Sequence, residues 1–366
     1  MKPAEPQAPL APWLQSQLAG LMASKAHALL LSGPSGLGQY DLALALARAW
    51  LCHRPTAQGA CGQCASCHAI DVRTHPDLCV LLPETLSLAL DWPLDEKTQA
   101  ELDGKKRKPS KEIKVEAARE VVGFTQLTRS GGASKVVLVY PAERLNGIAA
   151  NALLKTLEEP VGQTRFVLAT QAADQLLPTI RSRCQTHAMV WPSFEDALSW
   201  LVEQGAGAQG PTNAREPLPE PLRENLREHL RVLLRAAGGR PADVLQWLQD
   251  SDARQAAERW RALPKAIVRG DVAALANWSA AEVIDALQKL CHDVWLQRVG
   301  AEPRFFPAQD LPPARTGEGS PQRLLYALGQ WSRDLANSAR HADRPYSPGL
   351  MLEALVSRAQ QALRAT

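Results

Sequence analysis

Residues 135–187 read KVVLVYPAERLNGIAANALLKTLEEPVGQTRFVLATQAADQLLPTIRSRCQTH, and this stretch decides the fold. Apolar runs at Val136–Val139 and Phe166–Ala169 flank a helical segment, Asn151–Leu157. Short apolar runs bounded by turn residues are typical of buried strands, so the order predicts strand, helix, strand. At the end of the stretch, Ile180-Arg181-Ser182-Arg183-Cys184 sets two cations beside apolar residues, where burial is costly without a partner. We therefore expect one of these arginines to face a partner.

The rest of the first half of the chain continues this alternation. Further strands are predicted at Ala28–Leu31 and Leu78–Leu82, and further helices at Asp41–Cys52 and Val115–Leu127. Alternation of this kind predicts a parallel sheet with helices on its faces, up to about residue 189. Residues 83–111 lack a sustained period and predict an inserted surface loop. Beyond Trp191 the strand-like runs give way to helices rich in Leu, Ala and Trp, so the remainder is predicted to be helical.

Length and composition limit the class of protein. The chain has 366 residues, which is too long for one ordinary core and predicts two or three domains. Its 41 basic and 38 acidic residues give a net charge of +3, which neither demands nor excludes nucleic acid. No apolar run approaches the roughly 20 residues that span a bilayer, so we expect a cytoplasmic protein. Seven cysteines, four of them between positions 52 and 67, favour a reduced compartment and a bound metal over a disulfide framework.

A degenerate phosphate loop follows the first predicted strand. Gly33-Pro34-Ser35-Gly36-Leu37-Gly38-Gln39-Tyr40 has the frame of G-x-x-x-x-G-K-[ST], between a strand and a helix. Gln39 stands where a lysine would neutralise phosphates, and Tyr40 stands where a small hydroxyl would bind Mg²⁺. The sequence therefore predicts a scaffold that neither binds ATP tightly nor hydrolyses it. An anion held by the backbone N–H groups of Gly33, Gly36 and Gly38 is the alternative left open.

Four cysteines form a candidate metal site directly after this unit. Cys52, Cys61, Cys64 and Cys67 have the spacing C-x8-C-x2-C-x2-C, which matches a tetrahedral Zn²⁺ site. Four protein ligands leave no open position for catalysis, so the predicted zinc is structural. Unrelated core thiols are the weaker alternative because glycines and polar residues mark this segment as a loop. His53 or His68 could replace one cysteine, but neither is needed.

Three further motifs identify a family resemblance. NALLKTLEEP at residues 151–160, FVLAT at 166–170 and the triplet Ser182-Arg183-Cys184 have the order and spacing of bacterial AAA+ clamp-loader subunits. The chain resembles this family over about residues 10–190, and within it looks most like the delta-prime branch. The resemblance implies an AAA+ P-loop-type parallel sheet domain with the zinc module at 1–190. It also implies a small helical lid domain at 191–250 and an all-α C-terminal collar domain at 251–366.

The resemblance also assigns expected roles to single residues. Tyr140-Pro141 aligns where hydrolysing relatives carry an Asp-Glu pair, and Ala242 aligns where an arginine senses the γ-phosphate. Both departures agree with a non-hydrolysing subunit. Arg183 aligns with the arginine that AAA+ rings offer in trans to a neighbouring ATP site. Its alternative is a surface salt bridge, and Arg181 is equally well placed. Thr170 matches a sensor position, although strand-end packing is the better prediction for it.

The implied function is that of a rigid, non-hydrolysing clamp-loader subunit of DNA polymerase III. It would join gamma/tau and delta subunits in a hetero-pentamer that loads the sliding clamp onto primed DNA at the replisome. Nucleotidyltransferase activity would belong to the whole polymerase complex. The alternatives are an active gamma/tau-type ATPase and a zinc-dependent DNA-binding protein. The basic run at Lys105–Lys108 and Lys111 is predicted to be solvated loop, with phosphate contact as the less favoured interpretation.

Overall fold

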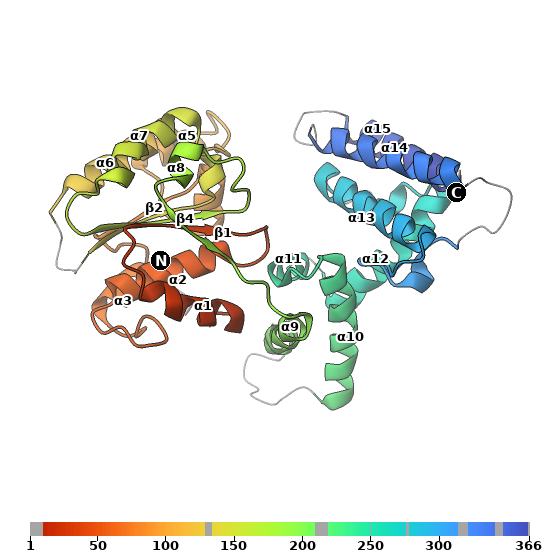
Figure 1. Ribbon diagram of the computed structural model, residues 1–366, viewed down its shortest axis with the longest axis horizontal. Helices are drawn as coiled ribbons and strands as arrows, with labels where there is room; N and C mark the ends of the chain where they lie inside the picture. The colour runs from red at the N-terminus through yellow and green to blue at the C-terminus, as the bar shows by residue number, and fades with distance from the viewer. Residues whose placement is uncertain are drawn as a thin grey trace. The chain divides into compact units, whose positions relative to one another are not determined.

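The computed structural model describes residues 10–128, 134–208, 219–249, 251–275, 278–313, 321–340 and 347–364. The chain divides into two compact units, Met1–Pro192 and Ser193–Thr366, and each is described by itself (Figure 1). Across the described residues we find no helix with both the length and the apolar character needed to cross a membrane.

The first unit is built on a five-stranded parallel sheet with the order β2-β3-β4-β1-β5. Its strands are β1 (Ala28–Ser32), β2 (Leu78–Leu81), β3 (Lys135–Val139), β4 (Thr164–Thr170) and β5 (Gln185–Ala188). The predicted α/β class and four of these strands are confirmed. The fifth was not predicted, because three of its four residues are exposed and it has no apolar run to reveal it.

Helices cover both faces of this sheet (Figure 1). On one face lie α6 (Val115–Gln126) and α7 (Gly147–Glu158), which pack on buried side chains of β3 and β4 such as Phe166. On the other lie α1 (Pro12–Met22), α2 (Gln39–Leu51) and α3 (Ala65–Asp71). Burial on both faces explains why β3 and β4 appear in the sequence as continuous apolar runs rather than alternating ones.

The segment 83–111 is a correction to the sequence prediction, because it is folded rather than a loop. It contains α4 (Glu84–Ala89) and α5 (Glu96–Asp103). The Glu84 carboxylate accepts two hydrogen bonds from Arg107 and one each from the Ser110 N–H (2.8 Å) and Lys114 Nζ (3.0 Å). A partly exposed charge network, rather than apolar periodicity, organises this segment, so a search for apolar periods does not detect it.

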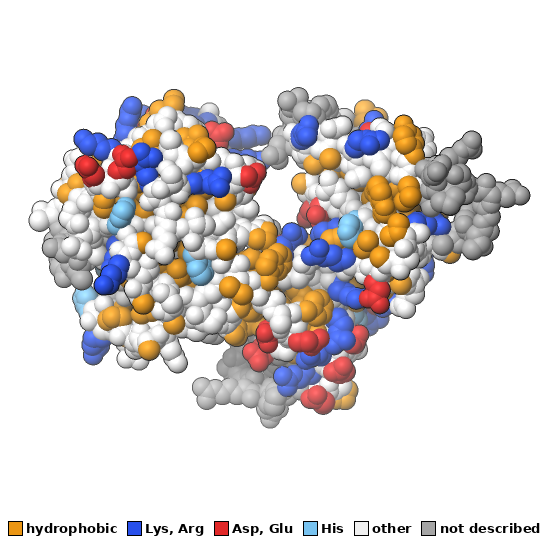
Figure 2. All heavy atoms as spheres, viewed as in Figure 1, with side chains coloured by type: hydrophobic (Ala, Val, Ile, Leu, Met, Phe, Trp, Pro, Cys, Tyr) orange, Lys and Arg blue, Asp and Glu red, His pale blue; other side chains and the backbone are white. Residues whose placement is uncertain are grey.

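The second unit contains no strand among its described residues, which confirms the predicted helical character. Its helices are α9 (Phe194–Ala208), α10 (Glu220–Ala236), α11 (Pro241–Trp247), α12 (Ala253–Arg269), α13 (Ala280–Arg298), α14 (Pro321–Ala339) and α15 (Pro348–Arg364). One buried cluster joins α9 to α11 with the start of α12, and a second joins α12 to α15. Trp260 lies in the second cluster, with its ring 6.2 Å from that of Trp247 and 6.4 Å from that of Trp278. Figure 2 shows charged side chains gathered along α10.

Candidate functional site

The phosphate-loop frame survives in the backbone between β1 and α2. Gly36 (φ 83°) and Gly38 (φ 86°) adopt left-handed conformations that favour glycine. A Cβ at position 38 would also lie 2.7 Å from Leu14 Cδ1, so the Leu14 side chain would have to shift. The backbone conformation therefore favours glycine at both positions whether or not a nucleotide binds.

Gln39 fills the place of the lysine with a neutral amide that faces inward. The residue is only 1% exposed, and its Nε2 donates hydrogen bonds to the carbonyl oxygens of Gly33 (2.7 Å) and Pro34 (2.6 Å). These bonds tie the side chain to the loop itself. The loop therefore presents no cation to a phosphate, and it lacks the charge-assisted hydrogen bond that such a site depends on.

Two tyrosines and a tryptophan gather where β3 ends and α2 begins. The Tyr40 and Tyr140 rings lie 5.5 Å apart, Trp92 Nε1 donates to the Tyr40 hydroxyl at 2.5 Å, and Gln171 Nε2 donates to the Tyr140 hydroxyl at 2.7 Å. Arg73 lies over the Trp92 ring at 4.5 Å. We call Tyr40, Tyr140 and Trp92 the aromatic plug. Burial raises the pKa of Tyr140 to about 12, so its hydroxyl remains neutral and is a poor ligand for Mg²⁺.

Sequence reasoning identified two members of the aromatic plug and missed the third. Trp92 belongs to the insertion between β2 and α6 and lies 52 residues from Tyr40, and no motif connects the two positions. Since Glu84 anchors the same insertion, the folded segment and the plug form one structural feature. The insertion thus reaches the degenerate loop, a contact that the sequence did not predict.

The carboxyl ends of β3 and β4 carry a hydrogen-bonded carboxylate rather than an exposed acidic pair. Tyr140-Pro141 follows β3, as the sequence shows, and Glu143 comes just after it. Thr170 is fully buried at the end of β4 and donates from Oγ1 to Glu143 Oε2 at 2.7 Å. The Gln171 N–H donates to the same carboxylate at 3.1 Å. Thr170 is therefore held by a hydrogen bond as well as by the predicted strand-end packing.

The third departure, Ala242, lies in α11 of the second unit. Its neighbour Arg240 pairs with Asp243, with 2.7 Å between Nε and Oδ2. Arg240 is thus engaged by an ion pair at the start of α11.

The four predicted zinc ligands converge on one point. Their sulfur atoms all lie within 4.8 Å of one another, with Cys52–Cys64 at 3.8 Å, Cys64–Cys67 at 3.5 Å and Cys67–Cys52 at 3.8 Å. Zn–S bonds of about 2.3 Å in a tetrahedron require sulfur atoms about 3.8 Å apart. The same separations are far beyond the roughly 2.05 Å of a disulfide. The donor set therefore fits Zn²⁺, with Cys52, Cys61, Cys64 and Cys67 as ligands and neither His53 nor His68 among them.

Backbone groups prepare this cluster for a cation. N–H groups of Arg54 (3.4 Å) and Cys61 (3.3 Å) point at Cys52 Sγ. Burial opposes ionisation of Cys64, yet hydrogen bonds from the backbone of Cys67 and His53 lower its pKa to about 6. Burial raises the pKa of Cys67 to about 12, so this thiol would need the metal itself to ionise.

Arg183 lies between α8 (Pro178–Arg181) and β5 and is half-buried, with 27% of its side chain exposed. Its Nη1 donates to the Thr179 carbonyl at 2.8 Å, and its Nη2 pairs with Glu158, a residue whose side chain is 49% exposed. Nε is buried without a hydrogen-bond partner. Arg181 is exposed. The isolated chain thus holds Arg183 in the surface ion pair that was the alternative prediction, and it keeps the guanidinium within reach of solvent.

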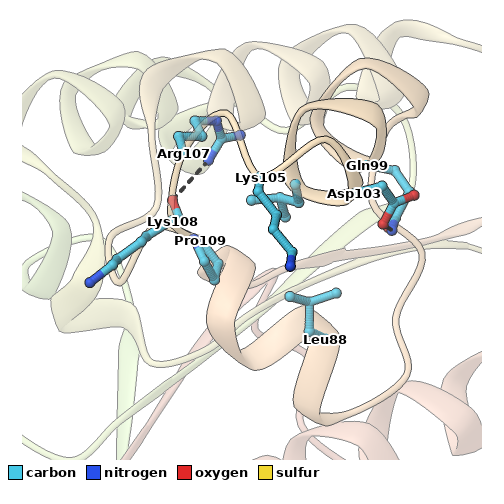
Figure 3. Close-up of a pocket in the computed structure, with 8 residues that line it drawn as sticks. Leu88, Gln99, Asp103, Lys105, Arg107, Lys108 and Pro109 are labelled. Carbon is cyan, nitrogen blue, oxygen red and sulfur yellow. Dashed lines mark hydrogen bonds between the residues drawn. The ribbon is translucent and has the colours of Figure 1, made fainter.

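The basic run of the insertion separates into two kinds of residue. Arg107 turns inward to Glu84 and Glu101, and Lys105, Lys106 and Lys108 are exposed. Figure 3 shows the pocket beside them, about 560 Å³ in volume, whose lining combines apolar and charged side chains. Its lining residues are Leu88, Gln99, Leu102, Asp103, Lys105, Arg107, Lys108 and Pro109.

A family model and two sequence relatives agree with the motifs. A family model described as DNA polymerase III, delta subunit matches residues 12–190. The DNA polymerase III subunit delta' of Pseudomonas aeruginosa is 44% identical over 194 residues, which cover 52% of this chain and 52% of that protein. The same subunit of Escherichia coli is 32% identical over 297 residues, 76% of each chain. A solved gamma subunit-related protein from Thermotoga maritima aligns with a TM-score of 0.43 and 16% identity, over 96% of this chain and 100% of that one.

Proposed function

This chain belongs to the delta-prime subunit family of DNA polymerase III, and on that premise we propose that it is a non-hydrolysing subunit of the clamp loader. In this role it helps to load the sliding clamp onto primed DNA during replication. It contributes structure and one catalytic side chain to the assembly, and the nucleotidyltransferase activity belongs to the whole polymerase complex.

The observation that carries this proposal is the aromatic plug beside Gln39. A working site needs a cation for the phosphates and small oxygen ligands for Mg²⁺. Here a neutral amide bonds to the loop's own carbonyls, and two tyrosine rings fill the place of the ligands. Steady-state ATP turnover tests the proposal. The chain alone should release no phosphate from ATP, whereas a loader reconstituted with it should turn over ATP faster when clamp and primed DNA are added. Turnover by the chain alone would contradict the proposal.

Zn²⁺ has a structural role in this proposal. Cys52 lies directly after α2, and Cys64 and Cys67 lie at the start of α3, so one ion would clamp the two helices. With four thiolates the ion has no open position, so it would supply a cross-link and no chemistry on a substrate. Ser66 supports the same junction, since its hydroxyl donates to the Leu51 carbonyl at 2.7 Å and contacts His75 at 2.9 Å.

Arg183 is the residue that we propose acts on a neighbouring subunit. It occupies the Ser-Arg-Cys triplet, where the family resemblance implies an arginine offered in trans. Its partner Glu158 is about half exposed, so solvent screens this ion pair and the pair contributes little free energy. Exchange of this carboxylate for a phosphate of a neighbour's ATP therefore costs little. The guanidinium would then stabilise the negative charge that develops on the phosphate oxygens in the transition state of ATP hydrolysis at the neighbouring site.

The remaining assignments rest on the family. We propose that residues 191–250 form a lid and residues 251–366 a collar that joins gamma/tau and delta subunits in a hetero-pentamer. We place the protein in the cytoplasm, at the replisome. The gamma/tau-type ATPase alternative conflicts with Gln39 and the aromatic plug. The alternative of a zinc-dependent DNA-binding protein is less favoured, because the cysteine module joins two helices of the sheet domain.

A further inference from the structure

One helix of the second unit carries a regular row of arginines that its proposed role does not use. Arg223, Arg227, Arg231 and Arg235 occupy every fourth position of α10. Residues four apart are neighbours on a helix surface, offset by about 40°, so the four side chains form a row that winds about 120° around α10, in steps of about 6 Å over about 18 Å. Figure 2 shows Lys and Arg side chains along α10 with acidic side chains among them. We call these four residues the arginine row.

An aromatic ring lies beside one end of the arginine row. Phe194, at the start of α9, is 36% exposed although it is a large apolar residue. Together with Glu195, Arg231 and Arg235 it lines a pocket of about 360 Å³. A basic track with an adjacent exposed aromatic ring is the arrangement by which proteins hold the phosphates of a single strand and stack one of its bases.

Carboxylates now neutralise part of the row, but weakly. Glu195 contacts Arg227 at 2.6 Å and Arg231 at 4.0 Å, and Glu228 contacts Arg231 at 3.9 Å. Both carboxylates are about three-fifths exposed, at 62% and 60%. Exposed pairs of this kind contribute little to stability, so a polyanion can displace them. Arg231 Nε is in addition buried without a hydrogen-bond partner.

We propose that the arginine row and Phe194 form a binding site for single-stranded DNA. At about 3.4 Å per phosphate of a stacked strand, the row spans about five phosphates. A duplex offers no unstacked base for the Phe194 ring, and an acidic peptide gives that ring no aromatic partner, so a single strand fits both parts of the site. This site lies in the isolated chain and does not depend on its proposed role in the clamp loader.

Fluorescence anisotropy with a labelled dT15 oligonucleotide and the full chain tests the proposal. Binding should be measurable at low salt, with log K falling as log salt rises. The double variant Arg231→Gln/Arg235→Gln should weaken binding about tenfold and reduce the salt slope by about 1.4, since each single-strand phosphate contact contributes about 0.7. Phe194→Leu should weaken binding about fivefold and leave the salt slope unchanged, because it removes stacking and no charge. Glu195→Gln should tighten binding, because it removes the competing carboxylate.

A matched charge change in the other unit provides the control. Lys105→Gln/Lys108→Gln removes two exposed cations and should leave affinity and salt slope unchanged. Circular dichroism melts of every variant should match the native chain, since all altered side chains are exposed or half-buried. The proposal is overturned if the control pair weakens binding as much as the arginine pair, or if the native chain does not bind dT15 at low salt. Displacement of dT15 by polyglutamate at equal charge concentration would also overturn it, since the site would then recognise charge alone.

Discussion

The phosphate loop and the cysteine cluster lie at opposite ends of α2, and they differ in whether their ligand-binding side chains are present. The loop keeps its backbone, with Gly36 and Gly38 in left-handed conformations, yet none of the side chains that would hold a nucleotide. The cluster keeps every donor, with four sulfur atoms inside 4.8 Å. The difference teaches that a motif's frame and its chemistry are retained for separate reasons. Backbone conformation favours glycine at positions 36 and 38, and a Cβ at position 38 would also crowd Leu14.

The largest effect is expected at the cysteine cluster, the site whose ligands are all present. Cys67→Ala should abolish zinc binding and lower the free energy of unfolding by several kcal/mol, because structural zinc contributes about 10–16 kcal/mol in small domains. The first unit should then melt more than about 10 °C lower. Native mass spectrometry should count one zinc per native chain and none in the variant. Cys184→Ala, outside the cluster, should retain the metal, and full zinc occupancy in Cys67→Ala would contradict the assignment.

Arg183 sharpens the comparison, because we propose that it supplies to a neighbouring subunit the positive charge that the phosphate loop of this chain lacks. In a reconstituted loader, Arg183→Ala should slow ATP turnover at the neighbouring site by about 10³, the contribution typical of such an arginine. DNA-stimulated phosphate release measures this, with assembly checked by gel filtration. Arg181→Ala should stay within about twofold of the native rate. If Arg183 were only half of a surface ion pair, Arg183→Ala and Glu158→Gln would have the same small effect on stability and none on turnover.

Glu84 tests whether a charge network holds the insertion that delivers Trp92. Burial opposes ionisation of Glu84, but hydrogen bonds from Arg107, Ser110 and Lys114 lower its pKa from 4.5 to about 2. A depressed carboxyl pKa stabilises the folded state above pH 4.5, and this stabilisation is lost as the pH falls from 4.5 through about 2.

The matching measurement is urea unfolding between pH 2 and 7. Glu84→Gln should lower stability near neutral pH by about 1–2 kcal/mol, less than the full pKa shift implies because solvent screens the network. The native and variant curves should converge as the pH falls toward 2. Exposed Glu112→Gln should lie on the native curve, and a constant offset at every pH would show that Glu84 does not act through its charge.

The smallest effect on stability is expected for a substitution in the aromatic plug. Trp92→Phe keeps an aromatic ring and removes the hydrogen bond to the Tyr40 hydroxyl, so stability should fall by about 1 kcal/mol. Thermal unfolding followed by circular dichroism should detect a shift of a few degrees. An unchanged melting temperature would mean that the insertion does not hold the plug.

Features marked by a local sequence pattern could be predicted, and features held by contacts between residues distant in the sequence could not. β3 and β4 are buried on both faces, so their apolar runs predicted them, whereas exposed β5 left no such signal. The cysteine spacing predicted the sulfur cluster. Trp92 and the folded 83–111 segment escaped prediction because a charge network and a contact across 52 positions hold them. The arginine row escaped because a search for contiguous charge selects the basic run at 105–108 and overlooks charges that recur at every fourth residue of a helix.

Calorimetric titration of Mg-ATP into the zinc-loaded chain tests the central claim most directly, that a nucleotide-binding frame has persisted without its chemistry. The account predicts no saturable heat up to about millimolar nucleotide, because Gln39 and the two tyrosines offer neither a cation nor ligands for Mg²⁺. A saturable isotherm with a micromolar Kd would contradict it.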